Sequence, residues 1–206
     1  TPIQLANMMA TVANEGFYYT PHIIKKIEEH QIDKKFTTKH VTTIDKKYFK
    51  PIISGLFDVY NSGTARALRV EGIDICGKTG TAENFAKIGG VKVQLKDHSI
   101  FVAFAPKDNP KIAIAVEIEN GGFGATIAGP IASLMIEKYL RQKITRMDLE
   151  KKILATSLQS EYAKLGGLSA KVKAQIRISD SLLYKKKAIP VVKVKIDSTT
   201  EKKQAI

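Results

Sequence analysis

Hydrophobic and polar positions alternate along the first 140 residues with two spacings, one typical of helices and one of strands. A first helix is predicted by apolar residues that fall on one helical face: Leu5, Met8, Met9 and Val12. Thr1 and Gln4 have the spacing of a capping box, and Pro2 suits the first helical turn. Gly16 supplies a stop at the other end.

A second helix is predicted over residues 43–61, where Pro51 lies in an early turn that tolerates a missing N–H. Its apolar face consists of Phe49, Ile52, Ile53, Leu56, Phe57 and Tyr60. Residues 17–29 between the two helices are expected to be extended or hairpin-like. The stretch NSGTARAL, residues 61–68, predicts a turn with one short helical turn.

Three apolar runs predict strands at residues 73–82, 99–105 and 112–118. The turn sequence PKDNP joins the last two, so we expect them to form an antiparallel hairpin. The runs lack strict polar alternation, which indicates that helices cover both faces of the sheet. With a further helix at about residues 127–140, the predicted fold class is α+β, an α/β sandwich with an antiparallel sheet flanked by helices.

The chain beyond residue 140 has a different pattern. Residues 144–165 predict an amphipathic helix that ends at Gly166 and Gly167, and a short strand is possible at residues 191–196. We therefore expect three parts: a main domain at 1–140, a helical extension at 141–166 and a basic, mobile tail at 167–206.

Charge and composition exclude several classes of function. The chain carries a net charge of +13, but residues 1–140 hold 17 basic and 14 acidic residues, so most of the excess lies in the tail. Contact with nucleic acid is therefore not expected. The single cysteine, Cys76, excludes an internal disulfide and is interpreted as a core residue. No apolar run reaches the roughly 18 residues of a membrane span, so any anchor is expected outside this sequence.

The stretch ICGKTGTAE, residues 75–83, carries the candidate chemistry. Together with the residues before it, this stretch matches the P-loop pattern of nucleotide-binding proteins. That pattern is a glycine, four residues, then Gly-Lys-Thr, which here runs from Gly72 to Thr79. A P-loop must curl into the start of a helix, whereas the Ile, Asp, Ile and Cys residues between the two glycines favour an extended backbone. We therefore predict a strand through Lys78 and keep nucleotide binding as an alternative.

A strand at this position suits recognition of a peptide carboxylate. Lys78 and Gly80 point to one face while Thr79 and Thr81 point to the other, unless a twist at Gly80 brings them together over the edge. An ammonium, two hydroxyls and the N–H groups of an exposed edge are groups that bind a carboxylate.

Lys78, Thr79 and Gly80 resemble the Lys-Thr-Gly box of penicillin-binding proteins and serine β-lactamases, and GKTGTAE resembles its form in large transpeptidases. The stretches TPIQLANMMATVANEG, SGTARAL and FVAFAPKDNPKIAIAVEIENGG resemble their neighbouring segments in penicillin-binding proteins of type 2. The resemblance covers residues 1–140. It implies the C-terminal half of a serine D,D-transpeptidase domain, which cross-links peptidoglycan and is acylated by penicillin.

The resemblance also implies roles for single residues. Lys78 would assist proton transfers at the catalytic serine, Thr79 and Thr81 would hold the terminal carboxylate of the donor peptide, and the Thr81 N–H would serve the oxyanion hole. Gly80 would let the peptide lie against the strand. A loop over the substrate groove is expected at Asn120, Gly121 and Gly122, whereas His22 and His98 are interpreted as structural or surface residues.

The implied ligands are stem peptides that end in D-Ala-D-Ala, and β-lactams; neither a cofactor nor a metal ion is expected. By analogy, the location is the cell envelope at the periplasmic face of the inner membrane, and the partners are proteins of the cell-elongation machinery.

The chain departs from the family pattern because it contains neither a Ser-x-x-Lys nor a Ser-x-Asn box. The nucleophile is therefore expected on sequence outside this chain, and the isolated chain is predicted to be inactive. A non-catalytic module that binds peptidoglycan or a partner protein remains a further alternative.

Overall fold

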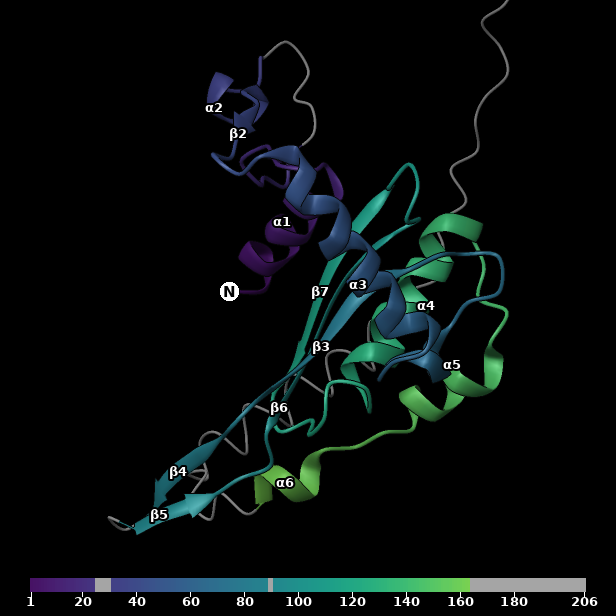
Figure 1. Cartoon of the computed structure of the whole chain (residues 1–206). Helices are drawn as coiled ribbons and strands as arrows, with labels where there is room; N and C mark the ends of the chain where they lie inside the picture. The colour runs from purple at the N-terminus through teal and green to yellow at the C-terminus, as the bar shows by residue number, and fades with distance from the viewer. Residues whose placement is uncertain (25–30, 89–90, 164–206) are drawn as a thin grey trace, which may run out of the picture. The chain divides into compact units, whose positions relative to one another are not determined.

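A computed structural model describes residues 1–24, 31–88 and 91–163. Contacts divide the chain into two units, residues 1–165 and 166–206, and all described residues belong to the first. Its centre is a three-stranded antiparallel sheet in the order β3-β6-β7 (Figure 1). These strands are β3 (Cys76–Ala82), β6 (His98–Ala105) and β7 (Ile112–Ile118). The predicted fold class and the predicted β6–β7 hairpin are confirmed.

Helices cover both faces of this sheet. The helices α1 (Pro2–Ala13) and α3 (Phe49–Asn61) contact the sheet on one face, and α4 (Ala128–Arg141) packs on β6 and β7 on the other. Successive side chains of a strand point to opposite faces, so Val102 and Phe104 of β6 join the α1–α3 core while Phe101 and Ala103 join the α4 core. All four are buried, which explains the continuous apolar run in the sequence.

Helix α1 begins and ends where the sequence predicts. Thr1 is its N-cap, and the Gln4 side-chain oxygen accepts a hydrogen bond from the Thr1 nitrogen at 2.9 Å. Beyond the last turn, Gly16 has a φ of 111°, a left-handed conformation that residues with a side chain rarely adopt.

The second helix begins later than the predicted residue 43. A 3₁₀ turn, η1 (Lys46–Tyr48), precedes α3, and the Asp45 carboxylate accepts a hydrogen bond from the Lys47 N–H at 3.1 Å. Asp45 therefore acts as the local cap, because its side chain satisfies an N–H that the first turn leaves free.

The single helix predicted over residues 144–165 is wrong. The chain forms two helices instead, α5 (Met147–Leu154) and α6 (Gln159–Ala163). Thr156 donates its hydroxyl to the Lys152 carbonyl at 2.9 Å, and the Ser157 hydroxyl accepts from the Gln159 N–H at 3.3 Å. Such hydroxyls compete with the helical hydrogen bonds and favour a break. Gly166, Gly167, the tail and the strand proposed at 191–196 lie outside the described residues.

Smaller elements complete the described chain. Strand β1 (Phe17–Tyr18) pairs with β2 (His40–Val41), and α2 (Lys34–Thr37) lies between them in the sequence. The predicted helical turn after NSGT is η2 (Arg66–Leu68). The antiparallel pair of β4 (Phe85–Ile88) and β5 (Val91–Gln94) was not predicted.

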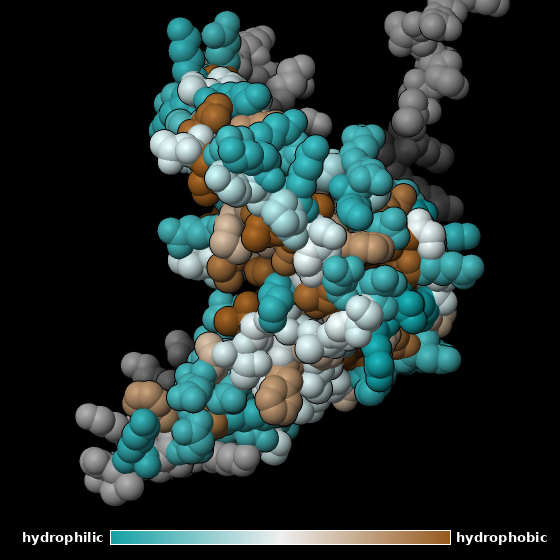
Figure 2. Space-filling model, in the orientation of Figure 1, coloured by the Kyte–Doolittle hydropathy of each residue, from teal (hydrophilic) through white to brown (hydrophobic). Residues whose placement is uncertain are grey.

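Part of the hydrophobic surface stays uncovered by the described residues. Figure 2 shows hydrophobic residues at the surface around α1 and α3. Ile3, Met8 and Ile52 on these two helices expose 59%, 47% and 54% of their surface. An exposed apolar area of this kind is typical of a face that packs against further protein.

Candidate active site

The predicted site residues lie on β3, which is an edge strand of the three-stranded sheet in the described part of the chain. Lys78 pairs with Val102 and Gly80 with Ile100 in an unbroken antiparallel register with β6. The backbone through the Lys-Thr-Gly box is therefore extended and does not curl into a helix. This geometry disfavours a P-loop, which needs N–H groups wrapped around phosphates at a helix N-terminus.

Lys78 and Thr79 come together at the exposed edge although they begin on opposite faces of the strand. The Lys78 ammonium donates to the Thr79 carbonyl at 3.0 Å and lies 3.5 Å from the Thr79 hydroxyl oxygen. The Thr64 hydroxyl, from the segment before η2, lies 3.3 Å from the same oxygen. None of the ion pairs among the described residues involves Lys78, so its positive charge is available to an anion.

Gly80 is in close contact with a second glycine that sequence reasoning did not single out. A Cβ atom built on Gly124 would lie 2.6 Å from the Gly80 carbonyl oxygen and 2.3 Å from the Ile100 carbonyl oxygen. Both distances are shorter than real Cβ contacts, so the backbone at residue 124 packs directly on β3 and β6. The sequence signal was the third glycine in NGGFGAT, which marks a close approach of two backbones.

The predicted groove loop is held to the sheet by its own hydrogen bonds. The Asn120 N–H donates to His98 Nδ1 at 3.2 Å, and the Asn84 amide donates to the Asn120 side-chain oxygen at 2.7 Å. The Gly122 N–H donates to the Asp97 carbonyl at 2.7 Å. His98 is thus structural, and the loop reaches the site strand through Gly124. A role in the groove for Asn120, Gly121 and Gly122 stays a prediction.

Ser99 continues this anchoring toward α4. Its buried hydroxyl donates to the Phe123 carbonyl at 3.0 Å and accepts from the Ala128 N–H at 3.2 Å. Ser99 pairs with Thr81 across the sheet. The Thr81 side chain itself is exposed, which leaves its hydroxyl open to a ligand.

The segment after Thr64 is held in place by hydrogen bonds from side chains of α4 and of the residues that follow α4. The Leu68 carbonyl accepts from the Ser133 hydroxyl at 2.7 Å and from Arg146 Nη1 at 3.2 Å. Arg141 donates to the Glu71 carbonyl. These bonds join residues 68–71, which lead into β3, to residues 133–146.

Glu137 is the centre of this support and is completely buried. Its carboxylate accepts from Arg146 Nε at 3.0 Å, from the Thr145 N–H at 3.0 Å and from the Thr145 hydroxyl. Burial alone raises the pKa of Glu137, but the hydrogen bonds from Thr145 and Arg146 outweigh it, so the pKa lies below its ordinary value. The sequence contains no local signal for this cluster.

The other candidate reactive groups are structural. Cys76 is buried, its thiol lies 3.6 Å from the Ile53 carbonyl oxygen, and burial raises its pKa to about 12. Its interpretation as a core residue is confirmed. His22 Nδ1 lies 3.0 Å from the Thr20 carbonyl oxygen. In the described ranges, no three His, Cys, Asp or Glu residues are grouped in a way that could hold a metal ion.

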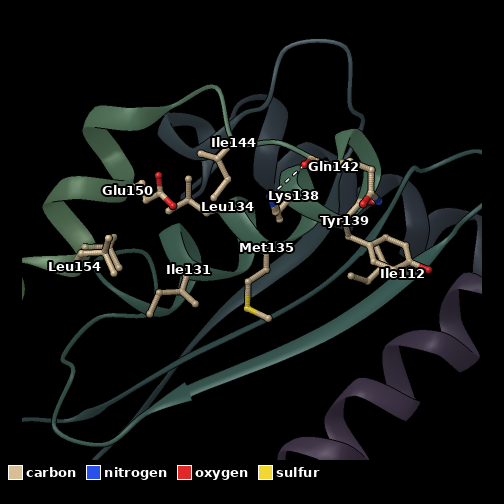
Figure 3. A pocket seen from close by; sticks show the side chains of 11 residues that line it. Ile112, Ile131, Leu134, Met135, Lys138, Tyr139, Gln142, Ile144, Glu150 and Leu154 are labelled. Carbon is tan, nitrogen blue, oxygen red and sulfur yellow. Dashed lines mark hydrogen bonds between the residues drawn. The ribbon is translucent and has the colours of Figure 1, made fainter. Parts of the chain in front are cut away.

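An apolar groove of about 520 Å³ lies between α4, α5 and the start of β7 (Figure 3). Met135 and Leu154 are among its lining residues, and Lys138 at its side donates to the Gln142 carbonyl at 3.1 Å. None of the predicted site residues lines it, so it is not part of the candidate active site.

Helices in the described part of the chain are all too short or too polar to span a bilayer.

A family comparison agrees with the geometry of the site strand. The family model "Penicillin binding protein transpeptidase domain" matches residues 1–137, which include the site strand and most of α4. The chain belongs to this family. The resemblance to penicillin-binding proteins of type 2 is thereby confirmed.

Curated relatives point to the same branch of the family. Peptidoglycan D,D-transpeptidase MrdA of Haemophilus influenzae is 31% identical over 161 residues, and MrdA of Acinetobacter baumannii is 35% identical over 142 residues. These alignments cover 72% and 62% of this chain, but only 25% and 20% of the relatives. The chain therefore spans about a quarter of the length of the relatives that it matches.

Solved structures with the same fold include penicillin-binding proteins in complex with small molecules. Pseudomonas aeruginosa PBP2 in complex with WCK 5153 has a TM-score of 0.54 at 30% identity, over 71% of this chain and 31% of that one. The imipenem acyl-enzyme complex of penicillin-binding protein A from M. tuberculosis has a TM-score of 0.54 at 28% identity, over 68% and 31%.

Proposed function

We propose that this chain supplies the Lys-Thr-Gly part of a peptidoglycan D,D-transpeptidase of the penicillin-binding protein 2 type. The observation that carries the proposal is the extended, exposed β3 edge, where the Lys78 ammonium lies beside the Thr79 hydroxyl. The names of the relatives and the inhibitor complexes of the structural neighbours support the same activity.

In the proposed reaction, the hydroxyl of a catalytic serine adds to the carbonyl of the penultimate D-Ala. An ester forms, the peptide bond to the terminal D-Ala breaks, and that D-Ala leaves with a proton on its new amine. An amine of a neighbouring stem peptide then attacks the ester, forms the cross-link and releases the serine. A β-lactam ring replaces the donor peptide bond and acylates the same serine.

The residues of the β3 edge have separate tasks in this proposal. Lys78 supplies positive charge and assists proton transfer, while the hydroxyls of Thr79 and Thr81 bind the terminal carboxylate of the donor. The Thr81 N–H is one donor of the oxyanion hole, and removal of one such donor in other enzymes costs on the order of 3 kcal/mol. Gly80 allows the donor peptide to approach the strand, and residues 120–122 border the groove.

The nucleophile is proposed to lie outside this chain, because no serine in it has a lysine three positions later or an asparagine two positions later. The isolated chain is therefore proposed to be inactive. Lys78 and the threonine hydroxyls could still form part of the binding site. Without the serine they cannot catalyse the reaction, because nucleophile and base act as a unit.

The setting of the activity is proposed by analogy with the relatives. The site would then lie in the cell envelope at the periplasmic face of the inner membrane, and proteins of the elongation machinery would be its partners. The division into a domain at 1–140, an extension at 141–166 and a basic tail at 167–206 is kept as a proposal. The family match ends at residue 137.

Labelling with fluorescent penicillin tests the proposed function. The product of the complete gene should form a covalent adduct that survives denaturation, and Lys78→Ala should slow labelling by about 100-fold or more, the scale of a lost acid–base group. Lys50→Ala is a matched control, because Lys50 is an exposed lysine on α3 away from the site. The isolated 206-residue chain should not label.

A folded product of the complete gene that fails to react with penicillin would refute catalysis and favour a non-catalytic binding module. Magnesium-dependent ATP binding that Lys78→Ala abolishes would restore the P-loop alternative.

A further inference from the structure

Among the described residues, Thr64 is the one residue outside β3 whose side chain has a hydrogen-bond contact with the Lys-Thr-Gly box. Its Oγ1 lies 3.3 Å from Thr79 Oγ1, and this same Thr79 oxygen lies 3.5 Å from the Lys78 ammonium. A lysine ammonium is a donor only, whereas each threonine hydroxyl can donate one hydrogen and accept at two lone pairs. The three groups therefore form a short chain of polar contacts at the exposed edge.

The position of Thr64 is set by its neighbours in the sequence. Ala65 is fully buried, and its N–H donates to the Val59 carbonyl of α3 at 3.0 Å. The Leu68 N–H donates to the Ala65 carbonyl at 2.9 Å, and the Leu68 carbonyl is held in turn by Ser133 and Arg146. These hydrogen bonds hold the backbone that carries Thr64 close to β3.

Either hydroxyl can be the donor in the Thr64–Thr79 contact, and one of the two directions leaves Thr79 ready to bind a ligand. When Thr79 Oγ1 accepts from both Lys78 and Thr64, its two lone pairs are occupied. Its own hydrogen can then only be donated away from both groups. That is the arrangement that binds an acceptor-only ligand such as a carboxylate.

We propose that Thr64 is a positioning residue of the transpeptidase site: it donates to Thr79 Oγ1 and thereby turns the Thr79 hydrogen toward the terminal carboxylate of the donor peptide. This inference rests on the proposed function, because it requires Thr79 to bind that carboxylate. Thr64 acts through Thr79 and does not itself touch the ligand.

The test is the second-order rate of acylation by penicillin, measured on the product of the complete gene. Thr64→Val keeps the shape but removes the hydroxyl, and should lower the rate about fivefold, the loss of one neutral hydrogen bond. Thr64→Ser restores the hydroxyl and should recover most of the rate. Thr43→Val, at an exposed threonine outside the site, should leave the rate unchanged.

A double variant separates positioning from general support of the fold. If Thr64 acts only through Thr79, the variant Thr64→Val/Thr79→Val should react within about twofold of Thr79→Val alone, because coupled residues are not additive. Two independent penalties that multiply in the double variant would overturn the inference. Thermal unfolding should be the same for wild type and Thr64→Val, and if that variant misfolds, Thr64→Ala against Thr64→Ser gives the same comparison.

The outcomes distinguish this inference from the proposed function. A wild-type protein that does not label refutes the proposed function, and the inference falls with it. A wild-type protein that labels, with Thr64→Val equally reactive, overturns the inference alone.

Discussion

The edge of β3 and the cluster of Glu137, Thr145 and Arg146 are both polar, but the first is exposed to solvent and the second is centred on a buried carboxylate. Lys78 and Thr81 are exposed on one short strand, three positions apart in the sequence. Glu137 is completely buried and accepts from Arg146, which also donates to the Leu68 carbonyl, 78 positions away in the sequence. The side chains at the β3 edge are free to bind a ligand. The Glu137 carboxylate already has hydrogen-bond partners within the protein, so its role is to stabilise the fold.

The largest expected effect comes from breaking the buried cluster. Glu137→Leu leaves the partly buried Arg146 guanidinium without its carboxylate, and should lower the free energy of unfolding by about 3 kcal/mol or more. Chemical denaturation followed by circular dichroism measures this. Glu119→Leu is the control, because Glu119 is exposed and such surface changes stay within about 0.5 kcal/mol. Equal midpoints for the two variants would show that the cluster does not stabilise the fold.

A smaller effect is expected at Gly124, which packs on the site strand at Gly80. Gly124→Ala places a methyl group against the backbone of Gly80 and Ile100, and should cost about 1–3 kcal/mol while slowing penicillin labelling of the complete protein. Gly55→Ala is the matched control, since a Cβ there meets nothing within 4 Å. Gly55 lies inside a helix, so that change should stabilise by about 1 kcal/mol. Unchanged stability and labelling for Gly124→Ala would contradict the close contact.

The smallest effect is a pH dependence that only the buried region should show. The pKa of Glu137 is lower in the folded than in the unfolded chain, so its contribution is fully present above the ordinary glutamate pKa. It is lost as the pH falls through the lower, folded-state pKa. The stability difference between wild type and Glu137→Gln should therefore shrink in acid, measured by denaturation at a series of pH values. A difference that grows in acid would contradict the assigned direction.

Predictions from the sequence succeeded where the deciding interactions are local. The strand through Lys78, the β6–β7 hairpin and the capped helix α1 all follow from residue types within a few positions. The same local view missed the β4–β5 pair, although a Gly-Gly dipeptide followed by the alternating sequence VKVQ, residues 91–94, favours a hairpin. It also overlooked the hydroxyls of Thr156 and Ser157, which separate α5 from α6.

The site itself was predicted in part. The box from Lys78 to Thr81 could be found because its residue types and order are specific. Thr64 and Gly124 could not be assigned to it, because their contacts with Thr79 and Gly80 cross 15 and 44 positions of the sequence, and no local pattern names these partners.

By itself, the sequence determined the helices α1 and α4 and the three strands of the central sheet, that the Lys-Thr-Gly box runs along a strand, and that the chain resembles a transpeptidase. Only the tertiary structure decided that Lys78, Thr79 and Thr64 meet at one edge, that Gly124 packs on Gly80, and that Glu137 is buried with Arg146. The physical reason is range: backbone preference acts over neighbouring residues, whereas burial and hydrogen-bond partners are chosen only when distant segments pack together.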